Sequence, residues 1–267
     1  MTAVTINQNF RAVTAARADE PPSEAVLKTA EMFGIGLDET YEVTLYAGLR
    51  LDVRPGDVIS VTGPSGGGKS VLLARLGEAL AAAWPETPQV DLAAVALPAD
   101  RRVIDLVRPP LERALRTLST AGLADAFLLL RTPQELSDGQ RYRLRLALAI
   151  EKCGVQNDEC RVNNQDEGRN PAQAVSGSLC THHSSLITHH SSVLLADEFC
   201  STLDRLCARA VAYRVRRMAS REGVTVLAAS AHDDLLEDLA PDVLVIKHEG
   251  SRVEVVYADA ARGEERP

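Results

Sequence analysis

A glycine-rich loop between a predicted strand and a predicted helix constrains this chain more than any other feature. The segment GPSGGGKS (63–70) follows the apolar run VISV (58–61) and precedes SVLLARLGEALAAAW (70–84), whose pattern is typical of a helix. It matches G-x-x-x-x-G-K-[ST], a loop whose glycines let backbone N–H groups surround phosphate oxygens. An ordinary glycine-rich turn is the alternative. Because strand and helix are both in place, we predict a phosphate-binding loop in an α/β fold.

Each residue type in this loop has an expected role. We expect the Lys69 ammonium to reach the β- and γ-phosphates of a nucleotide and the Ser70 hydroxyl to bind Mg²⁺. The helix N-terminus adds partial positive charge to the same place. The remaining nucleotide contacts are expected from the loop and the first helical turn, at Gly63, Pro64, Ser65, Gly66, Gly67, Gly68 and Val71.

Two adjacent carboxylates follow a second apolar run, VLLADE (193–198). A buried strand on the neighbouring position of a parallel sheet would deliver Asp197 to the carboxyl edge, where ligands bind in such sheets. We expect Asp197 to hold Mg²⁺ and Glu198 to face the attacking water. For Glu198, a helix-capping or surface acid is the alternative.

Three further motifs follow in a fixed order: LSDGQ (136–140), STLD (201–204) and AHDD (231–234). With the phosphate loop (Walker A) and the two acids (Walker B), they resemble the ABC-type ATPases, the ATP-binding cassettes of the P-loop NTPase superfamily. The resemblance covers roughly residues 40–248, and five motifs in order are far more specific than any one of them. Alone, LSDGQ reads as a helix N-cap and His232 as a structural histidine.

The resemblance implies a fold, an activity and a set of partners. The fold is α/β, a P-loop core with an antiparallel β-subdomain and a helical subdomain, shortened here. The activity is hydrolysis of ATP with Mg²⁺, in which Glu198, Lys69 and His232 are catalytic. A homodimer, or a pair with another ABC subunit, would place the two copies head to tail. The γ-phosphate contacts from the other subunit are then Ser137, Gly139 and Gln140. An aromatic residue should stack on adenine; Tyr41 is the first candidate and Tyr46 the second, and both could instead be ordinary strand residues.

Several residues depart from the family pattern. Asp138 stands where the signature has glycine, Phe199 follows the acids where proline is usual, and no glutamine follows the predicted strand 90–97. The segment between Lys69 and Ser137 is also short, which weakens the transporter interpretation. A separate permease partner therefore stays open beside two alternatives, a nucleotide-gated dimerisation switch and a non-transport ATPase of the repair or regulatory type.

Composition excludes some classes of function. The formal charge of −8 argues against a generally basic nucleic-acid surface. No apolar run approaches the ~18 residues of a membrane span, so direct membrane insertion is not expected. The five cysteines, without a secretory signal, indicate reduced thiols in a cytoplasm.

The predicted organisation has one main domain. We expect a flexible N-terminal arm (1–25), the ABC ATPase domain (26–257) and a C-terminal tail (258–267). Within the domain, 41–61 should hold antiparallel strands that lead through a turn at RPGD (54–57) into the buried run VISV. Residues 110–130 should be helical with a break at Gly122.

A polar segment inside this domain, residues 153–192, exceeds the expected connection by about 40 residues and is predicted to be disordered. Three interpretations compete: a metal site, a partner-binding loop, and an inserted DNA palindrome translated in frame. The metal site would use Cys153, Cys160, Cys180 and the histidine pairs 182/183 and 189/190, in a spacing that matches no trusted zinc pattern. The palindrome would explain why QNDE and NQDE mirror HHSSL on the complementary strand.

Overall fold

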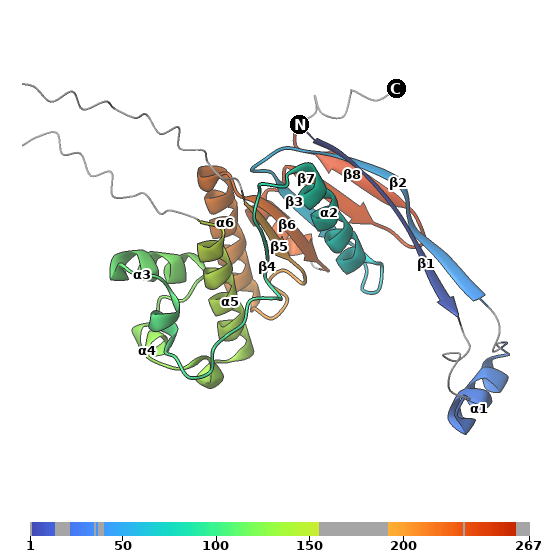
Figure 1. Ribbon diagram of the computed structural model, residues 1–267, viewed down its shortest axis with the longest axis horizontal. Coiled ribbons are helices and arrows are strands. Elements are labelled where there is room, and N and C mark those ends of the chain that lie inside the picture. Colours follow the sequence, from blue (N-terminus) through green and yellow to red (C-terminus); the bar gives the residue numbers. More distant parts are fainter. Residues whose placement is uncertain are drawn as a thin grey trace, which may run out of the picture.

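The molecule is organised around a six-stranded, mostly parallel sheet. The computed structural model describes residues 2–13, 22–34, 36, 40–154, 192–231 and 233–259 (Figure 1). The spatial order of the strands is β4–β5–β6–β3–β7–β8; the first five are parallel and β8 pairs antiparallel with β7. Their bounds are β3 (Val58–Thr62), β4 (Gln89–Asp91), β5 (Val193–Ala196), β6 (Thr225–Ser230), β7 (Val243–Lys247) and β8 (Val253–Tyr257). The mixed α/β fold predicted from the sequence is confirmed.

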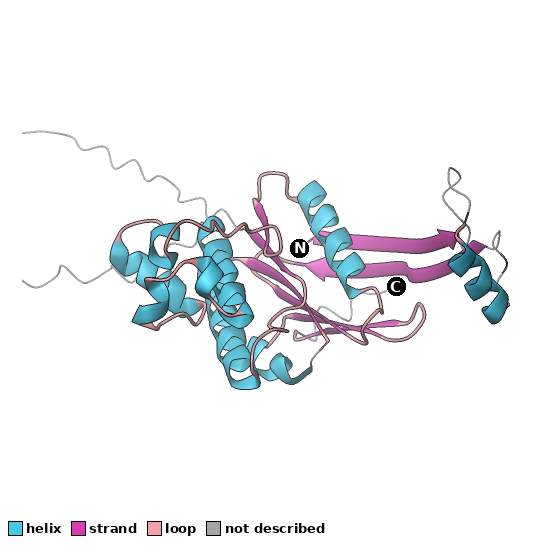
Figure 2. Cartoon of the chain, turned by 90° about the horizontal axis from the view of Figure 1, so that it is seen from below, coloured by secondary structure: helices cyan, strands magenta, loops and turns pink. Residues whose placement is uncertain are grey.

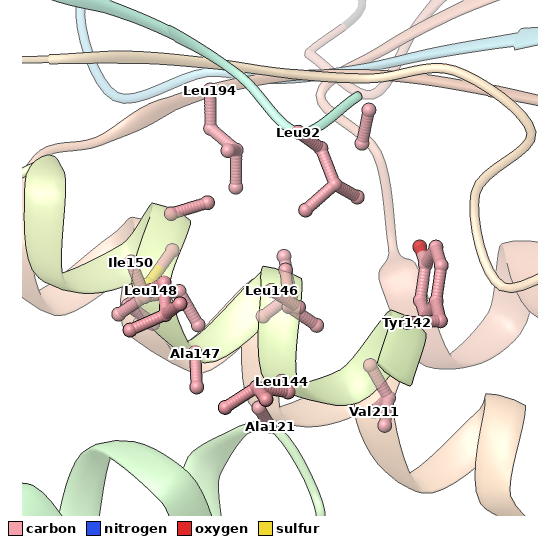
Figure 3. Close-up of a cluster of buried hydrophobic side chains, with 14 of the residues drawn as sticks. Leu92, Ala121, Tyr142, Leu144, Leu146, Ala147, Leu148, Ile150, Leu194 and Val211 are labelled. Carbon is pink, nitrogen blue, oxygen red and sulfur yellow. The ribbon is translucent and has the colours of Figure 1, made fainter. Parts of the chain in front are cut away.

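Helices cover both faces of this sheet because alternate strand residues point to opposite faces. Val226 and Ala228 of β6 pack in the core that contains α5 (Asp138–Lys152) and α6 (Arg205–Glu222). Leu227 and Ala229 pack in the core that contains α2 (Lys69–Ala83) and β2 (Thr40–Val53). Figure 3 shows the first of these cores, where Leu194 of β5 and Leu92, the residue after β4, face the apolar side chains of α5. Every strand residue of β6 is buried, which is the pattern of a strand covered on both faces.

A second, two-stranded sheet corrects two expectations. β1 (Thr2–Val13) pairs antiparallel with β2 (Thr40–Val53), with Thr2 opposite Val53. The loose arm expected over residues 1–25 is therefore wrong for residues 2–13. The strand pair expected within 41–61 is also wrong, because β2 is continuous and its partner is β1. Val4 and Ile6 are buried against the α2 side of the core, so apolar burial holds β1 in place.

A short helix, α1 (Glu24–Phe33), lies at the far end of the β1–β2 ribbon (Figure 2). Ser23 caps its N-terminus, and none of its residues is buried. The main domain therefore carries an extension that the sequence did not predict.

The helical region between β4 and α5 is compact. It contains η1 (Val103–Leu106), α3 (Leu111–Thr120), α4 (Ala126–Leu129) and η2 (Pro133–Glu135). The break expected at Gly122 is confirmed, with φ +86° between α3 and α4. The strand expected over 90–97 is shorter than predicted, since β4 ends at Asp91. The last helical turns are η3 (Asp233–Leu235) and α7 (Leu236–Leu239). Among the residues that the structure describes, no helix is both long and apolar enough to cross a membrane.

Candidate functional site

The phosphate loop connects β3 to α2 and needs its glycines. Gly63, Gly66 and Gly68 have φ angles of +143°, +76° and +88°, which other residues adopt only with strain. A Cβ atom on Gly63 would lie 2.3 Å from the backbone oxygen of Lys247, the last residue of β7. The loop therefore passes so close to β7 that only glycine fits at its first position.

The Lys69 side chain folds back over this loop. Its ammonium donates to the backbone oxygens of Gly63 and Pro64, at 2.9 and 2.8 Å. Gly68 is the N-cap residue of α2 and provides no side-chain cap, so the first N–H groups of the helix are left for a ligand. Charge and donors thus converge where the sequence predicted an anion. The other expected contact residues lie in the loop or first turn: Ser65 and Ser70 are exposed, and Gly67 and Val71 are partly buried.

The two acids follow β5 at the same edge of the sheet as the loop. β6 lies between β5 and β3, so the expectation of directly neighbouring strands is wrong. The three strands are parallel, however, and their carboxyl ends meet at one edge. Asp197 is partly buried and accepts from the Glu198 N–H at 2.9 Å, while Glu198 is exposed with φ +48°. The turn is fixed to β6 because the Phe199 N–H donates to the Ala229 oxygen at 2.7 Å.

The donor chemistry at this edge fits Mg²⁺. Ser70 supplies a hydroxyl and Asp197 a carboxylate, and Mg²⁺ prefers one or two such oxygens together with substrate phosphates and water. Across the described ranges, no group of three or more His, Cys, Asp and Glu residues could hold a metal by itself. Those residues therefore form no metal site by themselves. Ser70 and Asp197 suit a magnesium site whose other ligands are phosphate oxygens and water.

The signature segment forms the capped start of α5. The Ser137 hydroxyl accepts from the Gln140 N–H at 3.3 Å, and the Gln140 side chain accepts from the Ser137 N–H at 3.0 Å. This reciprocal capping box confirms the N-cap interpretation, and it does not test the phosphate contacts. Asp138, the departure from the family glycine, is exposed and pairs with Arg141 at 2.6 Å. A Cβ on Gly139 would lie 3.1 Å from the Thr202 oxygen, so this glycine permits the STLD segment to pass close by.

A tyrosine that the sequence did not single out joins this helix to the acidic turn. The Tyr142 hydroxyl accepts from the Cys200 N–H at 2.9 Å. Burial raises the pKa of Tyr142 well above its ordinary value and that of the Cys200 thiol to about 12, so both groups stay neutral. Cys200 has φ +60°, and the tyrosine holds this strained turn two residues after Glu198. Its position in an apolar face of α5 was the only signal in the sequence.

The adenine candidates have different outcomes. Tyr41 lies in β2, but its side chain is outside the described residues, and so is His232. Tyr46 is 0% exposed and donates to the Gly68 oxygen at 3.0 Å. The second candidate for stacking on adenine is therefore wrong, because a ring with no exposed surface has no face for a base. The Thr62 hydroxyl, at the end of β3, donates to the Asp233 carboxylate, which brings the chain next to His232 close to the loop.

The polar insertion begins and ends at adjacent points. The Ser192 hydroxyl donates to the Cys153 oxygen at 3.0 Å, and both residues are buried. Burial raises the pKa of the Cys153 thiol to about 11. Residues 155–191, which include the other proposed metal ligands Cys160, Cys180 and the histidines, lie outside the described residues. The three interpretations of the insertion stay predictions.

The fold has counterparts among solved structures. No protein-family model matches the sequence, and no curated protein matches it either. The structure is similar to the dimeric bacterial ABC transporter cassette MJ0796, with a TM-score of 0.53 and 16% identity over 80% of this chain and 91% of that one. It is also similar to MJ0796 in a post-hydrolysis state bound to ADP and Pi, with a TM-score of 0.52 and 15% identity over the same shares. The chain therefore has the fold of an ATP-binding cassette.

Proposed function

We propose that this protein binds ATP with Mg²⁺ at the phosphate loop and hydrolyses it as a head-to-tail dimer. The observation that carries the proposal is the loop itself, in which the Lys69 ammonium lies across the Gly63 and Pro64 oxygens beside an uncapped helix start. An ammonium held by neutral carbonyls can exchange them for phosphate oxygens, which form stronger charge-assisted bonds. The cassette fold supports this assignment.

The chemistry asks for positioning and charge neutralisation more than for covalent steps. Lys69 and the N–H groups of the loop bind the phosphates, and Ser70 and Asp197 hold Mg²⁺. The metal, when bound, neutralises charge on the β- and γ-phosphates. Glu198, exposed at the same sheet edge, orients the attacking water, and His232 contacts the γ-phosphate.

The dimer completes the site in this proposal. Ser137, Gly139 and Gln140 of one copy meet the γ-phosphate bound by the other, so the helix start of α5 supplies donors. MJ0796 is a dimeric cassette, which supports the same assembly here. The partner is a second copy or a paired ABC subunit, and the free thiols of Cys153 and Cys200 suit a cytoplasm.

Coupling to a separate permease is a second candidate for the role of the ATPase. Leu111 of α3, Phe127 of α4 and Leu130 are 57%, 79% and 58% exposed, so the helical region offers apolar side chains that a partner could cover. The missing glutamine after β4 weighs against this role. A nucleotide-gated switch remains the alternative if turnover is absent.

A steady-state ATPase assay tests the proposal. The wild type should release phosphate from MgATP, Lys69→Ala should lose nucleotide binding, and Arg75→Ala on the exposed side of α2 should behave as wild type. Glu198→Gln should retain binding, lose turnover and accumulate as an ATP-bound dimer in size-exclusion chromatography. Binding without turnover in the wild type would support the switch, and a folded wild type that binds no more ATP than Lys69→Ala would refute both.

A further inference from the structure

A buried tyrosine hydroxyl lies directly beneath the phosphate loop. Tyr46 of β2 is 0% exposed, and its hydroxyl donates to the Gly68 oxygen at 3.0 Å. Tyr46 and Gly68 are far apart in the chain, so this bond ties the loop to a different element of the fold. Neither the loop motif nor the order of the other motifs predicts it.

An irregularity in the β1–β2 ribbon aims this side chain inward. Leu49 pairs with Ile6 and Tyr46 pairs with Gln8, so two residues of β2 stand opposite one of β1. The extra residue is accommodated at Gly48, whose φ is +60°. A bulge of this kind shifts the alternation by one residue. As a result, Leu49 and Tyr46 both face the core, although strict alternation would separate them.

The bond has a direct consequence for the anion site. In a trans peptide the C=O of one residue and the N–H of the next point in opposite directions. Because the Gly68 oxygen is held toward the Tyr46 hydroxyl, the Lys69 N–H is held in the opposite direction, away from Tyr46. Lys69 is the first residue of α2, so its N–H has no partner within the helix and can donate to a ligand. The Leu72 N–H also donates to the Gly68 oxygen, at 3.0 Å, and the carbonyl can accept both bonds.

We propose that Tyr46 is a positioning residue for the polyphosphate: its hydroxyl holds the Gly68–Lys69 peptide so that the Lys69 N–H faces the phosphate site. This inference rests on the proposed function. It assigns Tyr46 to recognition of the phosphates and not of the base, in contrast to the adenine contact expected from the sequence.

The surroundings of Tyr46 keep the hydroxyl in place. The Lys247 ammonium lies 5.5 Å from the centre of the Tyr46 ring, and Lys247 is only 2% exposed. Lys247 donates to the oxygens of His248 and Gly250, which fixes its position at the end of β7. Burial raises the pKa of Tyr46 to about 12, so the hydroxyl remains protonated and able to donate at neutral pH.

The same region limits movement of the loop above Tyr46. A Cβ on Gly68 would lie 3.2 Å from Leu45 and 3.6 Å from the Tyr46 hydroxyl oxygen, and one on Gly67 would lie 3.5 Å from Lys247. The underside of the loop is therefore in contact with β2 and β7. Removing the hydroxyl leaves this packing intact and removes only the hydrogen bond.

The test compares Tyr46→Phe with Tyr257→Phe. Tyr257 of β8 is the matched control because its hydroxyl also bonds a backbone group, the Asp52 N–H at 3.0 Å, outside the phosphate loop. Dissociation constants are measured by calorimetry for two probes, MgATP and magnesium tripolyphosphate, which has no base. Tyr46→Phe should bind both probes about 5- to 10-fold more weakly, the loss expected for one hydrogen bond. If the protein turns over ATP, KM rises and kcat is unchanged.

Thermal unfolding separates positioning from simple structural support. Both variants should lose similar small amounts of thermal stability, while Tyr257→Phe keeps the wild-type affinity for both probes. Equal affinity in Tyr46→Phe and wild type would overturn the inference, and so would a loss confined to MgATP, since that would mark a base contact. A wild type that binds neither probe would overturn the proposed function and this inference with it, a result distinct from the other two.

Discussion

Replacing Gly63 by alanine should destabilise the protein through contact with β7. The φ angle of Gly63 is +143°, and a Cβ there would lie 2.3 Å from the Lys247 oxygen and 3.0 Å from the Lys247 Cβ. The first of these neighbours is backbone, and β3 pairs with β7 through Thr62 and Ile246 beside it. The new methyl group therefore cannot be accommodated by a side-chain rotation, and the loop or the end of β7 must move.

The size of the effect follows from two costs. A non-glycine residue in a sparsely populated backbone region costs about 1–3 kcal/mol. Overpacking a buried contact adds about 1–3 kcal/mol. Their sum is about 4 kcal/mol at mid-range, which corresponds to a fall of about 8–16 °C in the melting temperature of a domain of this size.

The matched control is Gly66→Ala, in the same loop. Gly66 has φ +76°, but a Cβ there would meet no atom within 4 Å, so only the backbone cost of about 1–2 kcal/mol applies. Differential scanning calorimetry of both variants measures the difference, which is the cost of the contact with Lys247. Equal melting temperatures for the two variants would refute the argument that β7 closes the underside of the loop.

Two other predictions concern the fold. Stability should fall as pH rises above about 9, because burial raises the pKa of Cys153 to about 11 and of Tyr46 and Cys200 to about 12. The folded chain holds these protons more tightly than the unfolded chain, so the stabilisation is complete below the ordinary pKa values and is lost toward pH 12. Urea unfolding midpoints that stay constant from pH 8 to 11 would contradict this prediction. Replacing residues 155–191 by a short Gly-Ser linker should leave stability unchanged or raise it by up to about 2 kcal/mol, since Ser192 already contacts Cys153. A urea midpoint lowered in the linker variant would instead show that the insertion supports the fold.

The features that the sequence predicted correctly are local in the chain. The glycine-rich turn between β3 and α2, the capped start of α5 and the break at Gly122 each depend on residues within a few positions of one another. Backbone geometry at such sites is fixed by the residue types themselves, as when Ser137 and Gln140 satisfy each other's N–H groups. A pattern of this kind can be recognised without knowing what the rest of the chain does.

The features that it missed depend on pairing across the chain. β1 is polar enough to pass for an arm, and only its contact with β2 shows that Val4 and Ile6 are core residues. The position of β6 between β3 and β5 is likewise a matter of strand order, which alternation of apolar residues does not encode. Tyr46 combines both difficulties, because its inward direction depends on a bulge opposite β1.

That bulge explains why the inward direction of Tyr46 could not be predicted from the sequence. Counting backward from the buried residues Leu49, Leu51 and Val53 at steps of two reaches Leu45 and then Tyr41, and it passes over Tyr46. Gly48 breaks the count with φ +60°, so the residue that the pattern assigns to the other face becomes fully buried. A glycine within an alternating strand is thus the signal that could have been used, because it marks the place where alternation restarts. Here Tyr46, two residues before that glycine, contacts the phosphate loop.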